Sequence, residues 1–76
     1  MRYFASARAA SGVPEEPLLA SDLGDLLAQI SERYGPRMTK ILDASSLLLD
    51  GVHVGDRYRT LPASCTVDVL PPFAGG

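Results

Sequence analysis

Residues 21–35, SDLGDLLAQISERYG, constrain the fold more strongly than any other part of the chain. Their apolar side chains recur at the spacing that gathers them on one face of an α-helix. Ser21 or Asp22 can cap the start of this helix, and the Gly35-Pro36 pair ends it. An amphipathic helix needs an apolar surface against its buried face, so the rest of the chain must supply one. The residues to be covered are Leu23, Leu26, Leu27, Ile30 and Tyr34.

Short segments on both sides of this helix have the composition of β-strands. Pro17 restricts one of them to a sheet edge or a strand start, because proline has no N–H to donate. The Asp50-Gly51 pair predicts a tight turn after another. We expect strands over residues 1–6, 15–20, 46–50 and 65–70, a turn or one helical turn over 7–12, a short helical turn over 37–43, and a loop with a short edge strand over 52–62.

The last expected strand, CTVDVL, alternates in polarity along its length. We expect one face, with Cys65, Val67 and Val69, to join the core. The helix can form part of a crossover, so the first and last strands can pair in parallel. Together these elements predict an α+β fold in which one amphipathic helix packs across a single mixed sheet.

Length and composition narrow the class of protein. The 76 residues have room for one domain. Seven basic and nine acidic residues give a net charge of −2 and are scattered along the chain, which disfavours nucleic acid as a partner. The first ten residues lack the apolar stretch of a secretory signal, and no segment approaches the roughly 20 apolar residues that span a bilayer. We therefore expect a cytoplasmic protein with no membrane partner.

The polar side chains before the C-terminal segment do not combine into a self-contained active site. His53 has no companion ligand at metal-binding spacing, and we expect an ordinary surface histidine. Cys65, the only cysteine, should behave as a small hydrophobic residue. The sequence RYR at 57–59 fits a contact with a protein partner or, more readily, a solvated surface. The aspartates fit caps, turns and the outer face of a strand. No glycine-rich phosphate loop is present, and we expect no metal and no bound cofactor.

The C-terminal segment LPPFAGG differs in character from the rest of the chain. Leu70 closes the last expected strand, and Pro71 and Pro72 prevent further ladder bonding and direct the backbone outward. Residues 71–76 can reach at most about 20 Å when extended, and bare glycines can pass a channel too narrow for a Cβ atom. Such a segment is either a frayed terminus or a delivery arm whose terminal carboxylate takes part in chemistry.

Three stretches together resemble the small subunits of molybdopterin synthase, a family of ubiquitin-like sulfur carriers: YFASARAASG, the LLLDG turn and VDVLPPFAGG. The resemblance covers nearly the whole chain, because its features follow in the family's order. These are the opening strand, Arg8, Gly12, the central helix, the strand with its turn, and the tail. It implies a β-grasp (ubiquitin-like) domain over residues 1–70 and an extended tail over 71–76.

The resemblance also implies a mechanism in which the last glycine is the reactive group. An adenylating enzyme similar to the ubiquitin-activating class would use ATP and magnesium to activate Gly76, and a persulfide would then supply sulfur to form a C-terminal thiocarboxylate. The tail would enter the large subunit of molybdopterin synthase and deliver sulfur to the pterin precursor of the molybdenum cofactor. The chain would thus act as a sulfurtransferase subunit only within a hetero-oligomer. Gly76 would carry the sulfur, and the tail residues that bind the partner would be Pro71, Pro72, Phe73, Ala74 and Gly75.

Other functions stay open at this point. The chain can be a sulfur carrier for cysteine, thiazole or another thio-metabolite, although the diproline favours the molybdenum cofactor. It can be a ubiquitin-like modifier joined through Gly76 to lysines of target proteins, with Lys40 as the only lysine for self-conjugation. It can also be a binding module without tail chemistry. Phe73 fits a partner's pocket, and its alternative is to fold back onto Leu70.

Overall fold

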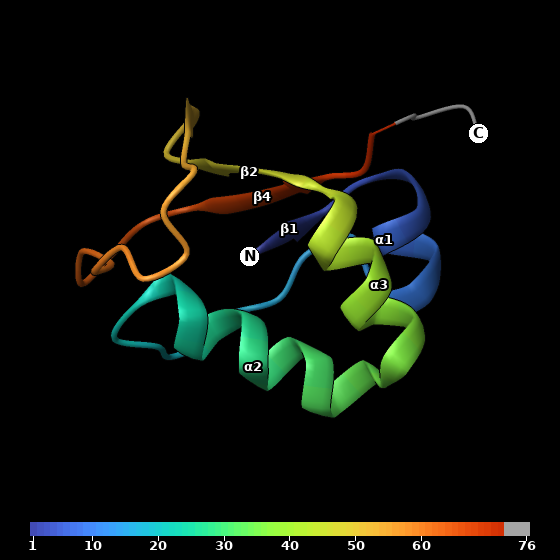
Figure 1. Ribbon diagram of the computed structural model, residues 1–76. Helices are drawn as coiled ribbons and strands as arrows, with labels where there is room; N and C mark the ends of the chain where they lie inside the picture. Colours follow the sequence, from blue (N-terminus) through green and yellow to red (C-terminus); the bar gives the residue numbers. More distant parts are fainter. Residues whose placement is uncertain (73–76) are drawn as a thin grey trace.

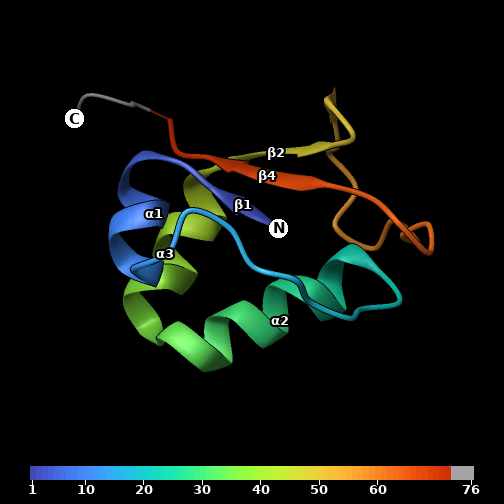
Figure 2. The same cartoon turned by 180° about the vertical axis from the view of Figure 1, so that it is seen from behind.

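The computed structural model describes residues 1–72 of the chain. In this part of the chain a mixed four-stranded sheet packs against three helices, so the fold is α+β. The helices lie on one side of the sheet, as both views show (Figures 1 and 2). The elements follow in the order β1 (Arg2–Tyr3), α1 (Ala5–Ser11), α2 (Leu23–Tyr34), α3 (Pro36–Ala44), β2 (Ser46–Leu49), β3 (Val52–His53) and β4 (Val67–Leu70).

The sheet has the strand order β1-β4-β2-β3, which places the last strand between the first and the second. β1 pairs with β4 in parallel, which confirms the predicted pairing of the first and last strands. β2 runs antiparallel to both β4 and β3. Tyr3, Val69 and Leu47 lie side by side on the three neighbouring strands and are all buried. They form the sheet's contribution to the core.

The predicted amphipathic helix is α2, and its buried residues face the sheet. Asp22 caps it, because the Asp22 carboxylate accepts a hydrogen bond of 2.7 Å from the backbone N–H of Asp25. Tyr34, at the end of the helix, is half-buried. The buried members of the predicted face are Leu23, Leu26, Leu27 and Ile30.

The turn between β2 and β3 forms where the Asp-Gly pair predicted it. Asp50 and Gly51 both have positive φ angles, 49° and 85°. Two consecutive residues with positive φ are typical of the type I′ turn, whose twist matches that of the flanking strands. Leu49 and Val52 pair directly across this turn.

The first strand is shorter than predicted, because a helix replaces its second half. β1 contains Arg2 and Tyr3, whereas residues 1–6 were expected to be extended. α1 runs from Ala5 to Ser11, and Gly12, with a φ of 78° and an N–H bond to the carbonyl of Arg8, caps its end. The alanine-rich sequence ASARAAS has a higher helix propensity than strand propensity, so the helix extends further toward the N-terminus than one turn.

The predicted strand over residues 15–20 is wrong. Glu15 forms only an isolated bridge with Arg2, although two backbone bonds hold this segment beside β1: Tyr3 N–H to Pro14 O (2.8 Å) and Glu16 N–H to Met1 O (3.0 Å). Pro17 cannot donate the next ladder bond, so the pairing stops there.

Two other boundaries also differ from the prediction. The helical turn expected over 37–43 is a full helix, α3, which starts at Pro36 because proline suits the first helical position. The last strand starts at Val67 instead of Cys65. The N–H of Thr66 donates to the Asp50 carboxylate, and the N–H of Asp50 donates to the carbonyl of Thr66. Thr66 is thus bound to the β2–β3 turn, and the ladder with β2 begins one residue later, at Val67.

Candidate functional site

The C-terminal segment starts directly from the central strand of the sheet. β4 ends at Leu70, as predicted, and the strand residues Val67 and Val69 are buried. Pro71 is half-buried and Pro72 is exposed, so the backbone passes from the core to the surface within two residues. It leaves at the end of the sheet that lies beside α1 (Figure 1). Of the predicted tail residues, Phe73, Ala74, Gly75 and Gly76 lie outside the described residues.

An aromatic ring and a charged pair lie close to this exit, on the face of the sheet away from the helices. The N–H of Phe4 donates to the carbonyl of Val69 (3.3 Å), which places Phe4 beside the end of β4. Phe4 is 39% exposed, and the guanidinium carbon of Arg2 lies 5.7 Å from the centre of its ring. Leu70, on the neighbouring strand, is half-buried. The surface around the exit therefore combines apolar side chains with one cation.

Arg2 binds Asp68 through two hydrogen bonds, of 2.5 Å from Nε and 2.7 Å from the terminal nitrogen. The Asp68 side chain is only 6% exposed, so the guanidinium covers a carboxylate that burial alone would disfavour. Hydrogen bonding to Asp68 raises the pKa of Arg2 above its ordinary value. The sequence placed Asp68 on the outer face of its strand but gave no signal for this partner, 66 residues away. The bidentate pair ties β1 to β4 next to the exit.

Glu16 is the centre of a second cluster that the sequence did not reveal. Its carboxylate, 10% exposed, accepts hydrogen bonds from the hydroxyls of Tyr3 (2.7 Å) and Tyr34 and forms an ion pair with Arg33. Burial opposes its ionisation, but the two tyrosine hydroxyls and the Arg33 charge outweigh burial and hold the pKa of Glu16 below its ordinary value. Burial and the neighbouring Glu16 raise the pKa of Tyr3. These groups join the segment before α2 to β1 and to the end of α2.

The predicted surface at residues 57–59 divides into two parts with different roles. The Arg57 guanidinium donates to the carbonyls of Leu42 (3.0 Å) and Ser45 (3.4 Å), where α3 ends. It caps that helix, so the expectation of a solvated charge is wrong for Arg57. Tyr58 is 85% exposed and remains a candidate for a protein contact.

His53 lies exposed in the edge strand β3, as expected of a surface histidine. Among residues 1–72, no group of three or more His, Cys, Asp or Glu side chains is arranged to hold a metal ion. Within the same residues, no helix combines the length and the apolar character that crossing a membrane requires.

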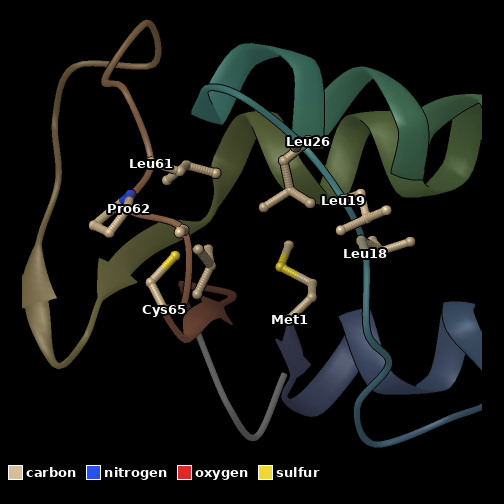
Figure 3. A pocket seen from close by; sticks show the side chains of 10 residues that line it. Met1, Leu18, Leu19, Leu26, Leu61, Pro62 and Cys65 are labelled. Carbon is tan, nitrogen blue, oxygen red and sulfur yellow. The ribbon is translucent and has the colours of Figure 1, made fainter.

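A cavity of about 130 Å³ opens at the other end of β4, where Cys65 lies (Figure 3). Cys65 and Met1 lie on one side of it, and Leu26 and Leu61 lie on the opposite side. Cys65 is half-buried here, beside the core rather than in the strand, so its thiol borders a hollow instead of close-packed side chains. The sequence carried no signal for this cavity, because its walls come from four separate segments of the chain.

Comparison of the sequence with models of known protein families and with curated proteins finds no match.

Proposed function

We propose that this chain is a ubiquitin-like sulfur carrier with a β-grasp fold that serves as the small subunit of molybdopterin synthase. The observation that carries the proposal is the position of the LPPFAGG segment directly after a buried central strand. β4 is held on both sides by β1 and β2, so it gives the tail a rigid base. Pro71 and Pro72 then lead the backbone away from the core.

The strand arrangement supports the β-grasp part of the proposal. The parallel pair β1–β4 has β2 and then β3 on the β4 side, and the segment at Pro14–Glu16 bonds to the other edge of β1. The helix α2 lies across the face formed by these strands (Figure 2). In a β-grasp fold we would expect β1 to form a hairpin with the segment that follows it. Here only two backbone bonds join β1 to residues 14–16, because α1 takes the place of the longer first strand.

The chemistry that we propose takes place at Gly76 and requires that Gly76 carry the terminal carboxylate. A carboxylate is a poor acceptor of nucleophiles, so an adenylating partner enzyme first joins it to AMP from ATP, with magnesium, and releases pyrophosphate. A persulfide sulfur displaces AMP, and a second thiol breaks the S–S bond to leave the thiocarboxylate. Inside the large subunit of the synthase, the thiocarboxylate sulfur then forms a carbon–sulfur bond to the pterin precursor in place of an oxygen leaving group. Water cleaves the bond between Gly76 and sulfur, which leaves the sulfur on the pterin and restores the terminal carboxylate.

The face of the sheet away from the helices suits the proposed partners. It lies beside the exit of the tail and carries Phe4 and the half-buried Leu70, with the cation of Arg2 next to them. A partner that covers this face would bury apolar surface and receive the tail at the same time. Gly75 and Gly76 would enter its channel, with Pro71, Pro72, Phe73 and Ala74 bound along the way.

The intact mass of the protein purified from its native host tests the proposal. We expect a population heavier by one oxygen-to-sulfur exchange, which alkylation shifts further. Deletion of Gly76 should abolish this population without unfolding the chain. Isopeptide-linked adducts in its place would favour a protein modifier, and a uniformly unmodified chain in cells that make molybdenum cofactor would rule out the carrier.

A matched pair of glycine substitutions tests the role assigned to the tail. Gly75→Ala adds one methyl group where we propose a narrow channel, and we expect it to lower sulfur transfer by the reconstituted complex. Gly55→Ala adds the same group at a loop position where the new Cβ would have no heavy atom within 4 Å outside the adjacent residues, and it should leave transfer unchanged. Equal activity of the two variants would contradict the channel.

A further inference from the structure

An open groove lies between α2 and α3, and the loop at 57–58 forms its third wall. Its volume is about 550 Å³, within the roughly 300–1,000 Å³ of ligand pockets. The start of α2, which this loop approaches, lies at the opposite end of the molecule from the point where β4 ends (Figures 1 and 2). The proposed delivery of sulfur through the tail therefore leaves the groove unused.

Three carboxylates line the groove, those of Asp22, Asp25 and Asp43. Asp22 caps α2, and Asp25 accepts a hydrogen bond of 3.3 Å from the side chain of Gln29. The two ion pairs within residues 1–72 involve other carboxylates, those of Asp68 and Glu16. None of the three groove carboxylates is therefore neutralised by an ion pair of the described chain.

Asp43 lies where its own helix disfavours a negative charge. It is exposed and belongs to the last turn of α3, which contains no basic residue. The dipole of a helix is negative at this end, so a cation is the charge that stabilises it. Folding does not explain a carboxylate at this position. A cation that binds from outside would be attracted both by the carboxylate and by the end of the helix.

The cation in the wall of the groove, Arg57, is bound to the backbone of the chain itself. Its guanidinium donates to the carbonyls of Leu42 and Ser45 at the end of α3. Arg59, the next cation of the loop, lines a different hollow beside Val52. Three carboxylates against one guanidinium leave the groove with a net negative charge.

Tyr58 presents an aromatic ring at the rim of the groove, on a backbone that is held in place. It is 85% exposed, and its N–H donates to the carboxylate of Asp56 (2.8 Å). The carbonyl of the next residue, Arg59, accepts from the N–H of Leu23 (2.9 Å). A Cβ atom on Gly24 would lie 4.0 Å from Cδ1 of the ring, so the ring lies at the start of α2. An exposed tyrosine on a fixed backbone loses little freedom on binding, which is typical of an interface anchor.

We propose that this groove receives an arginine side chain from a partner protein. The guanidinium would stack on the ring of Tyr58 and pair with Asp43, and its methylene groups would lie over the buried Leu27 and Leu42. Arginine fits better than lysine, because its planar group can stack on a ring and bind a carboxylate at the same time. The negative charge disfavours nucleic acid and anionic membranes. Because the groove lies far from the exit of the tail, this partner can bind while another protein holds the tail.

Titration of the isotope-labelled full chain with the peptide acetyl-Gly-Arg-Gly-amide, followed by NMR at low ionic strength, tests the site. We expect saturable shifts of the backbone amides of Gly24, Leu27, Asp43 and Tyr58. The same peptide with citrulline, which has nearly the shape of arginine but no charge, should give no saturable shifts. Equal shifts with the two peptides, shifts that do not saturate, or shifts mainly outside the groove would overturn the proposal.

Substitutions at exposed positions separate the groove from the overall charge of the chain. Asp43→Asn and Tyr58→Ala should each weaken binding of the arginine peptide by about fivefold, as expected for loss of an exposed ion pair or a cation–π contact. Glu32→Gln removes the same charge as Asp43→Asn at an exposed position of α2 outside the groove, and it should leave the affinity unchanged. An equal loss in Asp43→Asn and Glu32→Gln would show that the peptide responds only to net charge and would rule out the site.

Folding stability gives a readout that needs no peptide. Asp43→Asn should leave the midpoint of urea denaturation unchanged or raise it, because it removes a negative charge from the negative end of α3. A lower midpoint would show that Asp43 serves folding and would contradict the role given to it here. None of these measurements involves Gly76, so failure of the arginine site would leave the sulfur-carrier proposal unaffected, and the reverse also holds.

Discussion

A single carboxylate, that of Glu16, connects three parts of the chain that are distant in sequence. It binds Tyr3 in β1 and both Arg33 and Tyr34 at the end of α2. The rings of Tyr3 and Tyr34 meet edge to face, with centroids 6.1 Å apart. The segment before α2 contains no regular strand, so we infer that this cluster, together with two backbone bonds to β1, holds it in place.

We predict that Glu16→Gln lowers the free energy of unfolding by about 1–3 kcal/mol. The amide has nearly the same shape, but it cannot accept the Arg33 ion pair and both hydroxyl bonds as a charged group does. Urea denaturation measures the change. Glu32→Gln, the same substitution at an exposed position of α2, is the matched control and should have little effect. Equal stability of the two variants would contradict the role given to Glu16.

The effect of Glu16→Gln should depend on pH in a defined direction. The folded chain lowers the pKa of Glu16, so the stability that its charge contributes is complete above the ordinary pKa of a glutamate. This stability is lost as the pH falls through the lower, folded-state value. The difference between wild type and Glu16→Gln should therefore shrink in acid. Urea titrations at neutral and acidic pH measure it, and a difference that is constant or grows in acid would contradict the assignment.

Among the elements, the start of α2 is shaped by a close contact with the loop before β4. The N–H of Leu23 donates to the carbonyl of Arg59 (2.9 Å). A Cβ atom on Gly24 would lie 3.1 Å from the backbone oxygen of Arg57. The loop cannot easily move away, because the Arg57 side chain is bonded to the end of α3. Gly24 therefore allows a helix and a loop to meet.

We predict that Gly24→Ala destabilises the chain, although alanine favours an exposed helix by about 1 kcal/mol over glycine. Overpacking against the Arg57 backbone costs about 1–3 kcal/mol, so the net loss should be about 1 kcal/mol. Thermal and urea unfolding measure it. In an Arg57→Ala background the loop is released, and the same substitution should become neutral or stabilising. A gain in stability in the wild-type background would show that the loop yields freely.

The elements that the sequence predicted well are determined by residues close to one another in the sequence. The period of the leucines and the capping Asp22 define α2, and the Asp-Gly pair defines the turn after β2. The contacts that join elements could not be predicted in the same way. Glu16 meets residues 13 to 18 positions away, and Arg57 binds carbonyls 12 and 15 positions away. Neither has a spacing that a local pattern can show.

The candidate site at the exit of the C-terminal segment also has one part that the sequence predicted and one part that it could not predict. The exit of the segment at Pro71 and Pro72 was predictable, because prolines after an alternating strand end a ladder wherever it lies in the sheet. The surroundings of that exit, with Phe4 and the Arg2–Asp68 pair, depend on the parallel pairing of β1 with β4. Pairing across the whole chain decides which side chains become neighbours, so only the structure could supply them.

On the scale of the whole molecule, we expect the scaffold and the proposed delivery arm to be separable. Within residues 1–72, the buried core runs from Tyr3 to Val69, and β4 ends at Leu70. We predict that a chain ending at Pro72 unfolds within about 0.5 kcal/mol of the full chain. It should nevertheless fail as a substrate for adenylation and sulfur loading. Urea denaturation and intact mass after incubation with the activating enzyme measure the two properties. A loss of stability well above that value would mean that residues 73–76 pack against the domain, as in the alternative in which Phe73 folds back onto Leu70.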